Sequence, residues 1–395
     1  MSDSLGIYVS VPFCKAKCSF CNFASGVFAT ERIDGYVAQL VEEMRGARDF
    51  AQQLGARLPE RVDTIYFGGG TPSLLEPKVV ARIFAAIRGE FGVERDAEVT
   101  VECAPGQLSD ETLSAYLAEG ANRFSFGVQS FVDRECAAVG RLHTGAQCRD
   151  ELRRVERAGV QRVGIDLIVG LPQQTEATWR FSVAQAIESG VEHVSMYMLE
   201  VDDGSRLGRE ALAGGRRYGV GTLPDEDRVA DWYAAGCEWL ESAGVRQYEI
   251  SNFARQGGES RHNRRYWERK PYVGFGLDAH SMLRIGAGGV RWANPDEMDE
   301  YVGAGIGSRG FLRTVDRIGK EAAFEEALFL GLRLVEGVDL VAIDAEFGMS
   351  PDAVVELEEA GMVEFEGPRL RLTSRGRMAS NEVFERLLIG ASVPA

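Results

Sequence analysis

The sequence has a deficit of basic residues and no long hydrophobic run. Its 395 residues include 44 Lys and Arg against 60 Asp and Glu, so the formal net charge is −16. A protein that neutralises phosphates along DNA or RNA needs the opposite balance, and we therefore expect no nucleic-acid partner. The longest apolar stretch, around 165–171, is far shorter than the roughly 18 residues that indicate a transmembrane helix.

The first residues also lack a basic region followed by an apolar stretch, so the sequence predicts no secretory signal. We expect a cytoplasmic protein, in a compartment where thiols stay reduced. The chain has seven cysteines, an odd number. In a reducing compartment they indicate metal binding, catalysis or burial, and not a disulfide framework.

Short strand-like runs alternate with longer amphipathic stretches in the first half of the chain. The expected strands are 7–11, 64–67, 98–102, 123–127, 163–169 and 194–199. The expected helices are 33–48, 78–91, 110–119, 146–158 and 176–189, with C-cap signals at Gly92, Gly120, Gly159 and Gly190. This alternation predicts an α/β fold with a parallel sheet, either doubly wound or closed into a full or partial barrel. In both, the chemistry lies at the carboxyl ends of the strands.

The second half is less regular. Residues 205–222, rich in Gly and Arg, are expected to form a long loop or an insertion, and 225–242 a helix that Asp225 can cap. The polar, aromatic and glycine-rich stretch 252–281 is typical of a functional loop. We predict three parts, with the barrel and its site in 1–250, a connecting segment in 251–316 and a small α+β domain in 317–395.

The C-terminal part has the pattern of helices followed by a short β wing. We expect helices over 321–334 and 351–359, the second started by Ser350, a hairpin over 362–373 that turns at Gly367-Pro368, and a last helix to about Leu388. This order resembles a winged-helix unit. Because no basic surface accompanies it, we expect a structural or lid domain.

Three cysteines lie close together after the first predicted strand, in Cys14-Lys-Ala-Lys-Cys18-Ser-Phe-Cys21. A closed zinc site needs four ligands, and no Cys or His pair with zinc-finger spacing follows. Thiolates are the usual ligands of iron–sulfur clusters, and three of them on one loop can bind three irons of a 4Fe-4S cube. The fourth iron then lacks a protein ligand, which predicts a small molecule bound there. Cys103, Cys136, Cys148 and Cys237 are isolated and are expected to be core or incidental residues.

Glycines and polar residues stand at the ends of further predicted strands. The second strand ends in Phe67-Gly68-Gly69-Gly70-Thr71-Pro72-Ser73, where backbone N–H groups could meet a ligand; a plain turn is the alternative. A charge in a buried parallel strand is costly unless it is paired or ligand-bound. Glu102 and Asp166 are therefore expected to line a site, although each could form a structural ion pair. Gln129 and Arg141 follow other strands in the same way.

The CxxxCxxC spacing resembles that of the radical S-adenosylmethionine (SAM) superfamily. The resemblance implies that the amino and carboxylate groups of SAM occupy the open iron, and that one electron from the cluster cleaves SAM to a 5′-deoxyadenosyl radical. It also implies a partial (β/α)₆ barrel in which the cysteine loop follows the first strand, as it does here. In that superfamily the GGGTP segment contacts the methionine part of SAM.

Almost the whole chain, from Tyr8 to the C-terminal domain, resembles the family of oxygen-independent coproporphyrinogen III oxidase and its relative, the heme chaperone HemW. Three stretches agree in order, beginning at Ser125 (SFGVQS), Gly140 (GRLH) and Asp166 (DLIVGLP). The resemblance implies that Phe20 lies beside the cluster. It implies SAM contacts from Tyr8, Gly69, Gly70, Thr71, Glu102, Gln129, Arg141 and Asp166.

Two features favour the chaperone branch of this family. The oxidase pattern has a further cysteine two positions after the last ligand, where this chain has Phe23. The sequence from His262 to Tyr266 and Trp267 matches the HNxxYW motif proposed to bind heme. An imidazole can ligate heme iron, and aromatic rings can cover the porphyrin face. Because the motif lies in a polar, glycine-rich stretch, we expect His262 on an exposed loop at the barrel mouth, where its loss would cost little folding energy.

The resulting prediction is a heme chaperone that carries a SAM-liganded 4Fe-4S cluster and passes heme to an acceptor apoprotein. Reduced flavodoxin or ferredoxin is the implied candidate for an electron donor. Two alternatives stay open: a radical oxidase that decarboxylates two propionates of coproporphyrinogen III, and another radical SAM enzyme acting on tetrapyrroles, such as a C-methyltransferase or a heme-ring-opening enzyme.

Overall fold

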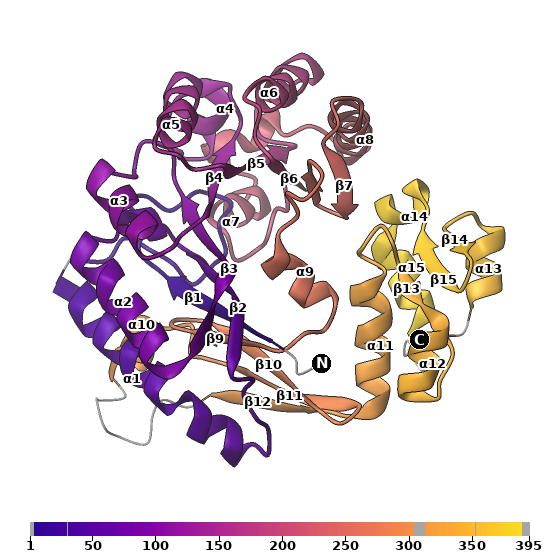
Figure 1. The fold of residues 1–395 in the computed structure, drawn as a ribbon. Coiled ribbons are helices and arrows are strands. Elements are labelled where there is room, and N and C mark those ends of the chain that lie inside the picture. Colours follow the sequence, from indigo (N-terminus) through magenta and orange to yellow (C-terminus); the bar gives the residue numbers. More distant parts are fainter. Residues whose placement is uncertain (1–3, 30, 304–312, 352, 389–395) are drawn as a thin grey trace.

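The computed structural model describes residues 4–29, 31–303, 313–351 and 353–388. Its first six strands lie side by side in chain order, each parallel to the next (Figure 1). A doubly wound sheet would reverse its strand order at a switch point, so this order identifies a partial (β/α)₆ barrel. The strands are β1 (Leu5–Val11), β2 (Arg61–Gly69), β3 (Gly92–Cys103), β4 (Arg123–Gln129), β5 (Arg162–Val169) and β6 (His193–Met198).

The helices between these strands cover the outside of the barrel. They are α1 (Glu31–Gln53), α2 (Pro77–Glu90), α3 (Asp110–Ala118), α5 (Gly145–Arg157) and α6 (Glu176–Glu188), with one more short helix, α4 (Asp133–Ala138). The six strands and five helices expected from the sequence are confirmed. The C-cap prediction at Gly92 is wrong, because Phe91 caps α2 and Gly92 already opens β3.

Successive side chains of the barrel strands alternate between the hydrophobic core and a cavity inside the barrel. In β1, Ile7, Val9 and Val11 belong to the hydrophobic core under the helices, whereas Tyr8 and Ser10 line a cavity inside the barrel. In β5, Ile165 and Leu167 are likewise core residues and Asp166 lines a cavity. Successive side chains of a strand point to opposite faces, so the polar residues of these apolar strands face inward together.

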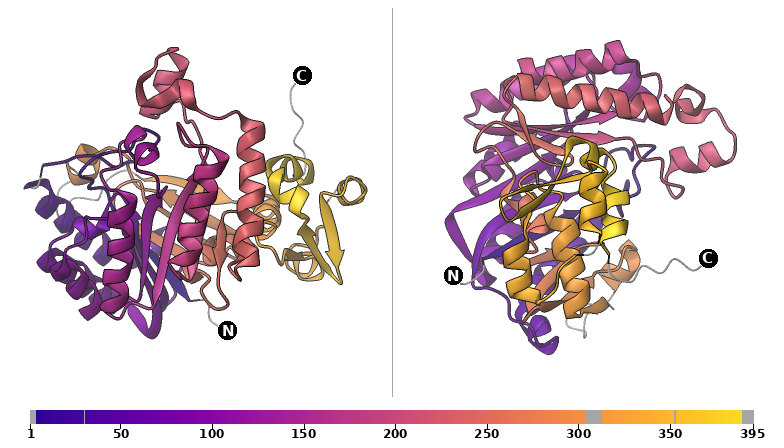
Figure 2. Two further views of the ribbon diagram at one scale, coloured as in Figure 1. Left: turned by 90° about the horizontal axis from the view of Figure 1, so that it is seen from above. Right: turned by 90° about the vertical axis from the view of Figure 1, so that its right-hand side faces the viewer.

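The segment after β6 is more ordered than expected. Residues 205–222 form α7 (Arg206–Leu212) and the 3-10 helix η2 (Arg217–Thr222), which project beyond the end of the barrel (Figure 2). The prediction of a long loop is wrong because the Ser205 side chain caps α7 by accepting from the Gly208 N–H, a signal that the Gly and Arg content obscured. The next helix, α8 (Glu226–Ser242), is confirmed with Asp225 as its N-cap.

Residues 246–318 extend the sheet at both edges. On one side β8 (Asn252–Ala254) pairs antiparallel with β6 and with β7 (Arg246–Glu249). On the other, β9 (Tyr272–Phe275) pairs parallel with β1 and leads to the antiparallel strands β10 (His280–Ile285), β11 (Gly288–Ala293) and β12 (Thr314–Ile318). The short helices α9 (Arg261–Trp267) and α10 (Met298–Gly303) lie in this segment. The stretch expected as a functional loop is therefore largely strand and helix.

The C-terminal part forms a small unit beside α9, β7 and β11, with a core that also includes Met282 of β10 (Figures 1 and 2). It contains α11 (Lys320–Gly331), β13 (Val338–Asp339), α12 (Leu340–Phe347), α13 (Val354–Glu359), β14 (Val363–Glu366), β15 (Arg369–Leu372), α14 (Ser374–Met378) and α15 (Ser380–Leu387). The predicted hairpin is confirmed as β14 and β15. The predicted N-cap Ser350 is wrong, since Ala353 holds that position, and the expected last helix is two helices.

Candidate functional site

A cavity of about 390 Å³ opens at the carboxyl ends of the barrel strands. Its lining brings together residues from the cysteine loop and from the ends of β2, β3, β4 and β5. Eleven of the residues predicted from the sequence line it: Cys14, Cys18, Phe20, Cys21, Gly69, Gly70, Thr71, Glu102, Gln129, Arg141 and Asp166. The structure therefore places cysteines and polar strand ends that are more than 100 residues apart in the chain around one space.

The three cysteines of the loop are free thiols with polar side chains beside them. The Thr71 hydroxyl lies 3.7 Å from the Cys14 sulfur, the Arg141 Nη1 lies 3.4 Å from the Cys18 sulfur, and the Ser25 hydroxyl lies 3.9 Å from the Cys21 sulfur. Burial raises the pKa of the Cys14 thiol, and the hydrogen bond from Thr71 opposes this rise.

These thiols suit a cluster better than a single ion. Within the described ranges, no three His, Cys, Asp or Glu side chains converge tightly enough to hold one metal ion. A 4Fe-4S cube is larger, since each thiolate binds a different iron. Three unpaired thiols around one cavity, with hydrogen-bond donors beside the sulfurs, fit that group. Fe–S clusters are tuned by such hydrogen bonds to sulfur.

The glycines at the end of β2 are required by the cysteine loop itself. A Cβ on Gly70 would stand 2.6 Å from the Val11 carbonyl oxygen, closer than any real contact. The Gly70 N–H donates to Val11 O and the Thr71 N–H to Phe13 O, both at 2.9 Å. The expectation that these N–H groups are free to meet a ligand is therefore wrong. The carbonyl oxygens of this segment and the Thr71 hydroxyl remain as groups that could bind a ligand. A carbonyl oxygen can accept a hydrogen bond from the ammonium group of a bound amino acid.

Glu102 and Asp166 face the same cavity, and burial dominates their titration. The pKa of Glu102 is raised to about 7, chiefly by burial and further by the nearby Asp166. The Tyr66 hydroxyl, which donates to Glu102 Oε1 at 2.8 Å, opposes the rise. Burial also raises the pKa of Asp166, which accepts from the Ser125 hydroxyl at 3.3 Å. Arg123 and Arg141 oppose the rise for Asp166, but among the described residues no basic side chain forms an ion pair with either carboxylate, so both are suited to a ligand.

Sequence reasoning missed several residues of this cavity. Ser125 and the β6 residues Tyr197 and Met198 line it, and the latter two are exposed large side chains. Their position at strand carboxyl ends was the available signal. Cys103, expected to be incidental, also lines the cavity, although its side chain is 5% exposed.

Tyr8 lies outside this cavity and lines a second one of about 360 Å³ on the other side of Gly69. The two cavities share Gly69 and Phe23 in their linings. The Tyr8 ring stacks on Tyr66 with centroids 6.1 Å apart. Tyr8 therefore adjoins the first cavity through Tyr66, whose hydroxyl holds Glu102, and through Gly69, where a Cβ would stand 3.3 Å from the Tyr8 hydroxyl.

His262 is buried, contrary to expectation. It lies in α9 with an exposed fraction of 0%, and its ring stacks on Tyr66 at 5.2 Å. Both ring nitrogens are engaged: Nδ1 lies 2.9 Å from the Thr64 hydroxyl and Nε2 2.9 Å from the Tyr266 hydroxyl. Burial lowers its pKa to about 3. The prediction of an exposed loop histidine at the barrel mouth is therefore wrong.

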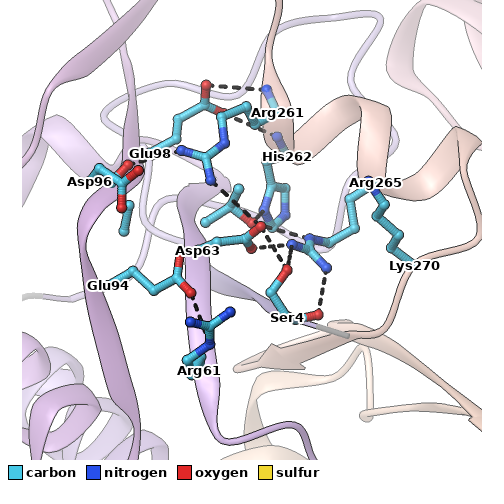
Figure 3. A network of polar contacts seen from close by, with 12 residues as sticks. Ser4, Arg61, Asp63, Glu94, Asp96, Glu98, Arg261, His262, Arg265 and Lys270 are labelled. Atoms are coloured by element: carbon cyan, nitrogen blue, oxygen red, sulfur yellow. Dashed lines mark hydrogen bonds and ion pairs between the residues drawn. The ribbon is translucent and has the colours of Figure 1, made fainter. Parts of the chain in front are cut away.

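A polar network holds α9 inside the amino-terminal end of the barrel (Figure 3). The Glu98 carboxylate accepts from the N–H groups of Arg261 and His262, at 3.1 and 3.0 Å. The Arg265 guanidinium is 2% exposed, forms an ion pair with Asp63, and donates to the Ser4 carbonyl oxygen at 2.9 Å. Because the first turn of a helix has unpaired N–H groups, a carboxylate there fixes the helix in place.

The other two predicted heme residues point to different places. Tyr266 lines the second cavity with Tyr8. Trp267 lines a third cavity toward the C-terminal unit, where the Arg333 guanidinium lies 4.2 Å from its ring centroid. The structure therefore does not bring His262, Tyr266 and Trp267 together around one space.

Comparison with known proteins gives the family. The radical SAM superfamily profile matches residues 8–186, and that of the HemN C-terminal domain matches 318–379. The "Heme chaperone HemW" of Lactococcus lactis is 33% identical over 97% of this chain and 97% of its own length. The chain belongs to the HemW family. The HemW of Bacillus subtilis is 32% identical over 96% of this chain and 98% of its own length.

The HemW family also has mitochondrial relatives, and its fold has been solved in a neighbouring protein. "Radical S-adenosyl methionine domain-containing protein 1, mitochondrial" of Bos taurus is 33% identical over 98% of this chain and 88% of its own length. Coproporphyrinogen III oxidase (HemN) of Escherichia coli superposes with a TM-score of 0.82, covering 98% of this chain and 91% of its own, at 22% identity. At that identity the match shows the fold alone. As a member of the radical SAM superfamily, this HemW-family protein carries a 4Fe-4S cluster and SAM.

Proposed function

We propose that this protein is a heme chaperone: it binds heme beside a SAM-liganded cluster and passes it to an acceptor apoprotein. The observation that carries the proposal is the match along 97% of the chain to proteins named heme chaperone. Phe23 supports it, since it stands where the oxidase pattern has a further cysteine.

The cavity at the barrel mouth suggests how the cofactors are held. Cys14, Cys18 and Cys21 would bind three irons of the cluster, with Phe20 beside it. The cluster supplies one-electron chemistry when it is present. The Gly69 and Gly70 carbonyl oxygens and the Thr71 hydroxyl would meet the amino acid part of SAM. The remaining polar lining, Glu102, Gln129, Arg141 and Asp166, would orient its ribose and adenine, with Tyr8 behind Tyr66.

Glu102→Gln should weaken SAM binding and remove its pH dependence. An ionised carboxylate that accepts from ribose hydroxyls forms charge-assisted bonds, and losing one leaves donors unpaired at a cost of roughly 1.5–3 kcal/mol. Because the pKa of Glu102 is about 7, the ionised form grows between pH 6 and 8, and wild-type affinity should rise over that range. Calorimetric SAM titration of the reconstituted protein checks both. Equal affinity and an equal pH profile in Glu102→Gln would rule out this contact.

Heme handling separates the chaperone from the oxidase. The anaerobically reconstituted protein should bind one ferric heme per chain, as followed by the Soret band. It should then transfer the heme to apomyoglobin, and should convert no coproporphyrinogen III to protoporphyrinogen when given SAM and a reductant. Turnover of coproporphyrinogen III without stoichiometric heme binding would contradict the chaperone function and support the oxidase.

The surroundings of the cysteine loop suit an acidic electron donor such as reduced flavodoxin or ferredoxin. Lys15 and Lys17 lie on the loop, and Arg206 on α7 donates to the Lys17 carbonyl oxygen. Arg209, one turn further along α7, adds a fourth basic side chain in a chain of net charge −16. We infer a cytoplasmic location, where the seven thiols, all free in this structure, would stay reduced. In the parts of the chain that are described, no helix is long and apolar enough to cross a membrane.

A further inference from the structure

We propose that heme binds in the second cavity and that His280, rather than His262, is the axial ligand of its iron. The inference rests on the proposed heme-binding function and assigns its site. It starts from the four histidines of the chain, all of which lie in the described ranges.

Three of these histidines are buried and engaged. His143 Nε2 lies 3.0 Å from the Val128 carbonyl oxygen, and His193 Nε2 lies 3.0 Å from the Tyr248 hydroxyl. His262 has both ring nitrogens in hydrogen bonds, so iron could reach it only if α9 broke two bonds and left the barrel. A ring that is already held on both sides is a poor ligand for an incoming metal.

His280 is the exception. It opens β10, its side chain is 57% exposed, and it lines the second cavity. Its Nε2 lies 3.7 Å from Oδ1 of Asp278, which also lines that cavity. This separation exceeds a hydrogen bond, so among the described residues no side-chain hydrogen bond occupies the ring nitrogens of His280. An exposed imidazole with unoccupied nitrogens is accessible to a metal.

The rest of the cavity suits a flat aromatic ring. Its walls include Tyr8, Tyr266 and Tyr272, the last two packed edge to face with centroids 4.7 Å apart. Leu277 and Ala24 add apolar surface. A volume of about 360 Å³ is smaller than a whole heme, so the cavity would cover one side of the ring and leave the rest in solvent. Because Asp278 and His280 are exposed at the rim, the charged propionates of heme could remain in water.

Phe23 gains a role in this arrangement. Its side chain is 63% exposed, although a large apolar ring normally gains from burial. It lines both cavities, so it would pack on the heme at the side that faces the cluster. The residue that separates this chain from the oxidase pattern therefore lies at the wall between the two sites.

His262 then acts as a positioning residue. Its Nε2 holds the Tyr266 hydroxyl, and its ring stacks on Tyr66, which in turn stacks on Tyr8. Two walls of the second cavity, Tyr8 and Tyr266, are thus fixed through His262. The HNxxYW motif thus contributes to heme binding through Tyr266, which lines the cavity, and through the His262 imidazole, which holds the Tyr266 hydroxyl.

Titration of the full-length reconstituted protein with ferric heme tests the assignment. His280→Ala should lower heme affinity at least tenfold and shift the Soret band, while cluster content and SAM affinity stay at wild-type values. Added imidazole should restore the Soret band of His280→Ala, and His280→Met should bind heme with a different axial-ligand spectrum. His262→Gln is the matched variant, since glutamine can still bond Tyr266; it should keep the wild-type Soret position.

The outcomes are distinct. A wild-type heme spectrum and affinity in His280→Ala, together with a changed Soret position in folded His262→Gln, would overturn the assignment in favour of His262. Wild-type spectra in both variants would overturn it as well, since neither imidazole would then ligate the iron. Failure of the wild-type protein to bind ferric heme at all would instead contradict the proposed function.

Discussion

Replacing Cys18 with alanine will leave the reconstituted protein without its iron–sulfur cluster. Cys14, Cys18 and Cys21 are the three thiols at the mouth of the cavity, and Cys18 receives the Arg141 guanidinium at 3.4 Å. A cube held by three thiolates retains only two protein bonds when one is lost, and no spare cysteine of the loop can substitute. Iron and sulfide content and the broad charge-transfer absorption should fall to background, and the same holds for Cys14→Ala and Cys21→Ala.

Two other cysteines serve as controls of different stringency. Cys103→Ala is the stringent one, because this thiol lines the same cavity at the end of β3. Burial raises the pKa of Cys103 well above its usual value, which disfavours its thiolate form, and Cys103 lies outside the three-cysteine loop. Cys148, buried on α5 away from the cavity lining, is the second. Unchanged iron and sulfide in Cys18→Ala, or their loss in Cys103→Ala, would refute the ligand assignment.

Arg265→Met will strongly destabilise the fold. The guanidinium is 2% exposed and is bonded to Asp63, to the carbonyl oxygens of Ser4 and Pro271, and to the Thr64 hydroxyl (Figure 3). Removing one partner of a buried ion pair leaves the other charge uncompensated, which costs roughly 3–5 kcal/mol. Urea unfolding followed by tryptophan fluorescence should show a markedly lower midpoint.

The same helix offers a matched control for that measurement. Arg261 also approaches Asp63, at 3.6 Å, but its side chain is 41% exposed. An exposed ion pair contributes about 0–1 kcal/mol, so Arg261→Ala should shift the midpoint little. If the two variants unfold at the same urea concentration, the buried network does not anchor α9 as we infer.

The strands and helices of the barrel were predictable because local signals agreed with the tertiary fold. Each expected strand was a run rich in β-branched or aromatic residues, the first five were each followed by an expected helix, and the parallel strands lie in chain order. The prediction for the less regular second half of the chain was wrong in places, for an identifiable reason. α7 is capped by Ser205, but its Gly and Arg content gave no periodicity, and β9 to β12 are short strands that depend on the edge at β1 for pairing.

For the candidate site, too, the sequence predicted some features correctly and misassigned others. The acidic strand ends could be found because a charge in a buried strand is energetically costly. The cysteines and the glycines could be found because packing alone does not explain such clusters. The barrel then brings all strand ends to one face. The glycines were assigned to ligand approach, whereas Gly70 is required by the backbone of Val11 and Phe13. That requirement comes from a segment almost 60 residues away in the chain.

The sequence by itself determined the alternation of strands and helices, the three-cysteine loop and the polar strand ends, because these follow from periodicity, spacing and chemistry that are local in the chain. Whether the sheet is doubly wound or a partial barrel was decided by the strand order in the structure. Only the tertiary structure decided which histidine can meet a ligand. His262 and His280 both lie in a polar, aromatic stretch and look alike in sequence. Thr64 and Tyr266 engage both ring nitrogens of the first and Glu98 its backbone N–H, whereas the second is exposed at the rim of a cavity. Burial and hydrogen-bond partners come from strands distant in sequence, and they decide whether an imidazole supports the fold or is free to bind iron.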